Sequence, residues 1–143
     1  MHKNSRHVVV PSIVNENESV ARRAYEQGDF VLCFLLSHSL IESLLRAFLE
    51  RTGKESFNDL IIAYENFIKS EGQTVSVFVN ELTEFNRRRN RVIHQLWKIG
   101  YSATNEKLES VCQSAFILFG LLIEWLETFD PEITETGFEF EKE

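Results

Sequence analysis

The sequence predicts an all-α protein, an antiparallel bundle of about five helices, from its turn residues, its hydrophobic spacing and its length. Only two prolines and six glycines occur in 143 residues, so few positions are set aside for turns and the helices must be long. Apolar residues recur every three or four positions, and no alternation typical of a strand persists. A chain of this length forms one domain whose core needs no disulfide or metal.

A Gly28-Asp29 break separates the first two predicted helices. Glycine favours the end of a helix and aspartate the start of the next, so we expect one helix over 13–27 and a second over 30–51. The second carries a long apolar stripe at helical spacing. The residues of this stripe are Phe30, Phe34, Ile41, Leu45 and Phe48.

The third and fourth helices are predicted over 57–69 and from about position 74 up to Gly100. Ser56 is a typical amino-terminal cap for the third helix, and Gly72 lies in the break between the two. The apolar positions of the fourth helix lead directly into a cluster of arginines in its second half. These apolar residues are Val75, Phe78, Val79, Leu82 and Phe85.

The fifth predicted helix, over 105–129, is apolar nearly all round between positions 115 and 126. Ser102 or Thr104 ahead of Glu106 forms a capping pattern for its start. A helix that is apolar on every side lies at the centre of a bundle or is shared with a second subunit. This surplus of apolar surface favours a homodimer.

The predicted domain spans 13–130, between a flexible amino-terminal arm over 1–12 and an acidic tail over 131–143. The tail is expected to be disordered, or alternatively to set its glutamates against the arginine cluster. The arm holds too short an apolar run for a signal sequence, and we expect no membrane-spanning stretch. Cys33 and Cys112 lie in apolar helical patterns, which favours buried structural thiols and a reducing, cytoplasmic setting.

The segment Arg87-Arg88-Arg89-Asn90-Arg91-Val92-Ile93-His94 carries the strongest chemical signal. Guanidinium groups bind phosphate oxygens, and imidazole exchanges protons near neutral pH. The net charge of −7 argues against a general nucleic-acid coat, so any nucleic-acid contact must be local. RNA is the partner that this pairing suggests. The plainer interpretation is that these arginines are solvated side chains near the carboxyl end of a helix, where positive charge interacts favourably with the helix dipole.

Arg89, the polar Asn90 and His94 resemble the motif of HEPN domains, in which a histidine follows an arginine after about four to six residues. Arg87 and Arg88 also fall within that spacing, and Asn90 favours Arg89. The helical layout strengthens the resemblance, because the opening helix-turn-helix also resembles the first half of HEPN domains. The resemblance covers most of the chain, from about position 14 to 129.

Because many HEPN domains with an intact motif are metal-independent endoribonucleases, the resemblance implies a function. His94 would act as general base on the ribose 2′-hydroxyl, and Arg89 would stabilise the phosphorane. The products would be a 2′,3′-cyclic phosphate and a 5′-hydroxyl, formed without a metal or cofactor. HEPN domains also pair their motifs at a dimer interface, which again implies a homodimer.

Helical geometry and the motif select different arginines. On a straight helix Arg87, Asn90 and Arg91 share a face with His94, whereas Arg89 points roughly 140 degrees away. A bent helix, or two subunits that each lend residues to a shared cleft, would bring Arg89 and His94 together. We assign Arg89 and His94 as catalytic residues and Arg87, Asn90 and Arg91 as substrate-binding residues.

A second polar set, four residues apart, lies on the second predicted helix: His38, Glu42 and Arg46. Glu42 falls near the apolar stripe, where an unpaired carboxylate is costly. Glu42 and Arg46 are expected either to orient an active-site arginine or to form a structural ion pair with each other. His38 is expected to be a satisfied interior or interface histidine.

Three functions compete. The first is a HEPN-type endoribonuclease, a toxin or defence effector with an antitoxin or regulatory protein as a candidate partner. The alternative is a catalytically silent HEPN-like bundle that binds RNA, a nucleotide or a partner protein. The third is a purely structural helical adaptor that uses the apolar fifth helix for assembly.

Overall fold

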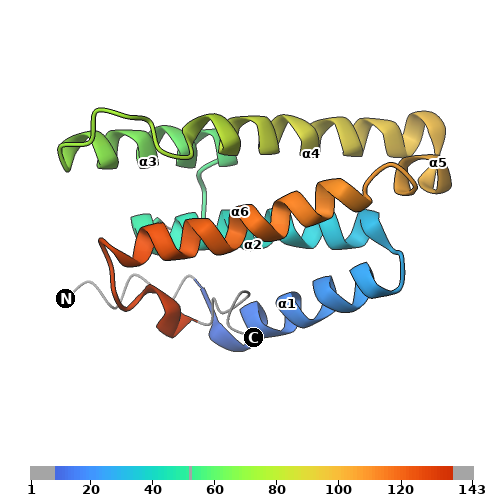
Figure 1. Cartoon of the computed structure of the whole chain (residues 1–143), viewed down its shortest axis with the longest axis horizontal. Coiled ribbons are helices and arrows are strands. Elements are labelled where there is room, and N and C mark those ends of the chain that lie inside the picture. The colour runs from blue at the N-terminus through green and yellow to red at the C-terminus, as the bar shows by residue number, and fades with distance from the viewer. Residues whose placement is uncertain (1–8, 52, 137–143) are drawn as a thin grey trace.

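The computed structural model describes residues 9–51 and 53–136, and within these ranges it contains helices and no strand. The all-α helical bundle predicted from the sequence is therefore confirmed, although the described residues form six α-helices rather than about five (Figure 1). In chain order, the helices are α1 Pro11–Glu26, α2 Phe30–Leu49, α3 Phe57–Ser70, α4 Val79–Ile99, α5 Tyr101–Asn105 and α6 Glu109–Glu127, followed by the 3-10 helix η2 Ile133–Thr136.

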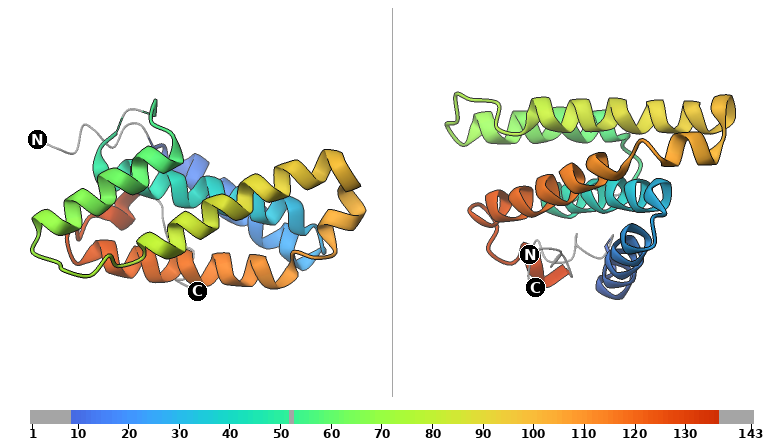
Figure 2. Two further views of the ribbon diagram at one scale, coloured as in Figure 1. Left: turned by 90° about the horizontal axis from the view of Figure 1, so that it is seen from above. Right: turned by 45° about the vertical axis from the view of Figure 1, so that its right-hand side comes forward.

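Helix α2 lies at the centre of the bundle and packs against α1, α3, α4 and α6. The helices form three layers, with α3 and α4 above, α2 and α6 in the middle, and α1 below (Figures 1 and 2). Phe34, Ile41 and Leu45 of the predicted stripe are fully buried, and Phe30 and Phe48 pack partly buried against the core. The predicted stripe is therefore the side that α2 buries, but the central position in the bundle was expected for the fifth predicted helix, now α6, as one of two alternatives, and it belongs to α2.

Helix α4 is attached to the bundle by one apolar seam, which we define as Leu82, Phe85 and Val92. These three side chains are buried at a spacing of three and seven residues, so they lie along one side of the helix. The Phe85 ring packs edge-on against Phe34 of α2, with 5.4 Å between ring centroids. The helix runs unbroken from Val79 to Ile99. Most of its remaining surface faces away from the core.

The start of α4 differs from the prediction. A helix was expected from about position 74, but residues 73–78 are not helical and the helix begins at Val79. The hydroxyl of Tyr64 in α3 donates to the backbone oxygen of Val77 at 2.7 Å, which fixes this connection beside α3. Phe78 has a positive φ of 66°, so the chain turns there into α4.

The short helix α5 was not predicted, and it replaces the expected start of a single long helix over 105–129. Asn105, its last residue, joins it to the turn between α1 and α2. The side-chain nitrogen donates to the backbone oxygen of Gly28 at 2.8 Å, and the side-chain oxygen accepts from the backbone nitrogen of Val31 at 2.9 Å. The hydroxyl of Tyr101 donates to the carboxylate of Asp29. A new helix, α6, then begins at Glu109.

The folded region extends beyond the predicted domain of 13–130 at both ends. Val9 is buried, α1 begins at Pro11, and Ile133 in η2 is fully buried. Burial of these apolar side chains holds both segments against the bundle. Positions 1–8 and 137–143 lie outside the described residues, and with them most of the predicted arm and half of the predicted acidic tail.

Cys33 in α2 and Cys112 in α6 are free and buried, as predicted. By length and composition alone, both of these helices would also pass for membrane spans, which the sequence analysis did not anticipate. More than half of the apolar stretch of α2 is buried inside the bundle, and a core helix has the same composition as a membrane span.

We predict that Asn105→Ala lowers the free energy of unfolding by about 1–3 kcal/mol, because two backbone groups near the α1–α2 turn lose their hydrogen-bond partner. Urea denaturation would measure it. The matched control is Asn15→Ala at an exposed position of α1, which should change stability by less than about 0.5 kcal/mol. Equal stability of the two variants would show that Asn105 does not hold α5 in place.

Candidate functional site on the outer face of α4

The outer face of α4, which we define as Arg87, Asn90, Arg91 and His94, lies opposite the apolar seam. All four side chains are exposed. They share one face because they are spaced by three, one and three residues on an unbroken helix. Helix α4 lies in an outer layer of the bundle, so this face is open to a ligand (Figure 2).

Glu84 forms ion pairs with both outer-face arginines. Its carboxylate oxygens lie 3.6 Å from Nη1 of Arg87 and 2.9 Å from Nη2 of Arg91. The hydrogen bond from Arg91 holds the pKa of the Glu84 carboxyl below its ordinary value. Exposed ion pairs of this kind contribute little to stability, so a phosphate group can replace the carboxylate. Glu84 thus holds the two guanidinium groups close to each other.

The indole of Trp97 lies beside the imidazole of His94. The two rings meet edge-on, with centroids 5.0 Å apart and planes at 80°. Both side chains are exposed, and Trp97 is 74% exposed. The imidazole is therefore accessible from the surface.

Arg89 lies on a different side of α4 from His94. Its Nη1 donates to the side-chain oxygen of Asn90 at 3.3 Å, and its charge acts on His38 of α2. The unbroken α4 does not supply the bend that would bring Arg89 to His94. The second route, a cleft shared by two subunits, stays a prediction.

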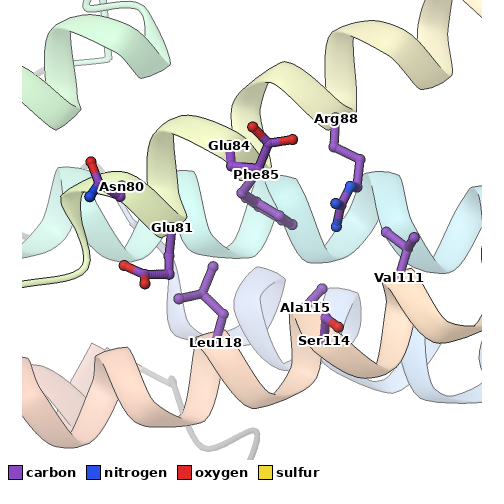
Figure 3. A pocket seen from close by; sticks show the side chains of 9 residues that line it. All are labelled: Asn80, Glu81, Glu84, Phe85, Arg88, Val111, Ser114, Ala115 and Leu118. Atoms are coloured by element: carbon purple, nitrogen blue, oxygen red, sulfur yellow. The ribbon is translucent and has the colours of Figure 1, made fainter.

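Arg88 points in a third direction, toward α6 (Figure 3). It borders a groove of about 310 Å³ between α4 and α6. Glu81 and Glu84 add carboxylates to the α4 wall, while Leu118 belongs to the mainly apolar α6 wall. The four arginines of the cluster therefore divide among three sides of the helix, and only Arg87 and Arg91 accompany His94.

Glu42 and Arg46 form an ion pair within α2, which is one of the two alternatives expected for them. Arg46 also donates to the backbone oxygen of Glu55 at 2.8 Å and lies 3.5 Å from its carboxylate. Arg46 therefore fixes the connection between α2 and α3. That the pair also orients an arginine of α4 stays a prediction.

His38 is buried, as expected of an interior histidine, and Nε2 donates to the side-chain oxygen of Asn86 at 3.1 Å. The ring stacks on Phe85 at 5.1 Å and packs against Phe57 at 4.6 Å. Burial lowers the pKa of His38 below its ordinary value. The hydrogen bond to Asn86 and the charge of Glu42 oppose this shift, and the charge of Arg89 adds to it.

Three contributors to this region were not predicted from the sequence: Glu84, Asn86 and Trp97. Helical spacing could have identified two of them. Glu84 lies three residues before Arg87 and seven before Arg91, on the same face, and Trp97 lies one turn after His94. Asn86 could not have been found in this way, because its partner His38 is on another helix.

Within residues 9–51 and 53–136, no group of three or more histidine, cysteine, aspartate or glutamate side chains is placed to hold a metal ion. No protein-family model matches the chain, and comparisons with curated proteins and solved structures gave no significant match. The side chains of α4 and their surroundings therefore carry the evidence for function.

We predict that stability falls as the pH drops below about 6.5, because the unfolded chain then binds a proton at position 38 that the folded protein resists. Stability continues to fall until the pH reaches the lower pKa of His38 in the folded protein. His38→Gln does not titrate and can still donate to Asn86, so its stability should fall less. Urea unfolding from pH 7.5 to 5 would measure the difference, at most about 1.4 kcal/mol per pH unit. Parallel pH profiles would contradict the prediction.

Proposed function

We propose that this protein is a metal-independent endoribonuclease of the HEPN type that cleaves RNA at the outer face of α4. One observation carries the proposal: His94 is exposed on the same helical face as the guanidinium groups of Arg87 and Arg91. Phosphate contacts and a proton acceptor thus lie within two helical turns. The resemblance of Arg89, Asn90 and His94 to the HEPN motif supports RNA as the substrate.

The proposed reaction uses the ribose 2′-hydroxyl as nucleophile. The imidazole of His94 removes its proton, and the oxygen attacks the adjacent phosphorus, with general-base help worth about a hundred- to ten-thousand-fold. Arg89 stabilises the charge on the phosphorane oxygens, and Arg87, Asn90 and Arg91 position the strand. The 5′ oxygen then leaves with a proton from an acid or water. The products are a 2′,3′-cyclic phosphate and a 5′-hydroxyl.

The position of Arg89 supports a site shared by two subunits in a homodimer. Arg89 and His94 point to different sides of α4, so one chain does not converge them on one phosphate. Ile93, which is 39% exposed, lies on the side of the helix between them. We place the contact between subunits there, so that Arg89 of one protomer meets the partner subunit's His94.

The second candidate function is a catalytically silent bundle that binds RNA, a nucleotide or a partner protein. It is favoured by the same divergence of Arg89 and His94 and by the apolar α6 surface, where Ile117 is 61% and Leu121 is 48% exposed. Such a surface suits a protein partner. A toxin or defence role in the cytoplasm, with an antitoxin or regulatory protein bound there, belongs to the first proposal.

We predict that the purified protein cleaves labelled RNA in the presence of a chelator and leaves 2′,3′-cyclic phosphate ends. His94→Ala should abolish cleavage while the thermal midpoint stays within about 2 °C of wild type, because an exposed side chain contributes little to packing. A strand with 2′-deoxyribose throughout is the matched control and should stay intact. Equal cleavage by wild type and His94→Ala would mean that His94 is not the catalytic base.

A further inference from the structure

We propose that Trp97 binds an unpaired RNA base by stacking and so places the neighbouring phosphate beside His94. This inference rests on the proposed function, and it adds a residue that recognises the base itself. The arginines of the outer face can contact any phosphate. Trp97 would instead require a base that is free to leave a helix.

Trp97 is more exposed than any other large hydrophobic side chain in the described residues, at 74%. Leaving an indole in water gives up the favourable free energy of burying it. The other tryptophan of the chain, Trp125, is partly buried and packs edge-on against Phe129 at 5.2 Å. The core of the protein thus does not need Trp97, which indicates a role at the surface.

The position of Trp97 suits a nucleotide bound across the end of α4. It lies one helical turn after His94, a rise of about 5 Å, and the two rings are nearly perpendicular at 80°. A base stacked on the indole therefore keeps its ribose and phosphate close to the imidazole. The same ligand would then engage the base-binding and the proton-accepting side chains together.

The positive charge of α4 favours a nucleic acid as the ligand of Trp97. Between Glu81 and Lys98, helix α4 carries five lysine and arginine residues against two glutamates, whereas the whole chain has a net charge of −7. A cationic track with an exposed aromatic ring is the combination that binds single strands, where the cations follow the backbone and the ring stacks on a base. An unpaired RNA segment is therefore the ligand that fits this end of α4.

The test uses the full-length chain with Trp125→Phe, so that fluorescence reports Trp97 alone. The probe is a mixed-sequence oligonucleotide with 2′-O-methyl groups at every position, which lacks the nucleophile and stays intact. We expect saturable quenching of Trp97. Trp97→Leu should weaken binding about tenfold, and Trp97→Phe, which keeps an aromatic ring, should restore most of it. Ile117→Ala, at another exposed apolar position, should leave the affinity unchanged.

An abasic form of the oligonucleotide keeps its phosphates and loses its bases. It should not quench Trp97, and it should bind wild type and Trp97→Leu equally.

If the intact oligonucleotide binds through Arg87 and Arg91 but Trp97→Leu binds it as tightly as wild type, the stacking inference fails and the RNA function stands. If wild type neither binds nor cleaves RNA, both the proposed function and the stacking inference are wrong. If Trp97→Leu converts a dimer to a monomer, Trp97 is an assembly contact and the inference is overturned.

Discussion

The apolar seam of α4 determines what the rest of the helix can do. Leu82, Phe85 and Val92 are buried against the bundle, and each fully buried side chain of this size contributes about 1.5–3 kcal/mol. Turning α4 by one residue, about 100 degrees, would move all three away from the core. The seam therefore fixes which residues face solvent, and it separates Arg89 from His94 within one chain.

The electrostatic character of the site follows from that fixed rotation. Arg87 and Arg91 both pair with Glu84, which keeps their guanidinium groups close to each other. The charge of Arg89 instead acts on His38, whose pKa is lowered chiefly by burial. Arg88 lies by the groove toward α6. Of the four arginines in the run, two therefore share a face with His94 and the other two lie on other sides of α4.

Local signals in the sequence were sufficient for the parts of the fold that depend on neighbouring residues. Ser56 caps α3 as predicted, in a reciprocal pair with Asp59, and the shared face of Arg87 and His94 follows from helical spacing alone. The late start of α4 and the extra helix α5 depend on contacts with distant residues. Asn105, for example, bonds to a turn 77 residues away, which no local pattern reveals. The same limit applies to the exposure of Trp97, because burial is decided by the whole bundle.

We infer that the catalytic site is shared between two protomers, and mixed dimers would test this inference. Arg89→Ala and His94→Ala proteins would each be inactive alone, and would then be mixed, unfolded and refolded together. A shared site predicts recovery of about a quarter of wild-type turnover, because half of the dimers are mixed and each of these holds one intact site of two. If both residues act within one chain, every site keeps one defect. A mixture no more active than either variant alone would contradict the account.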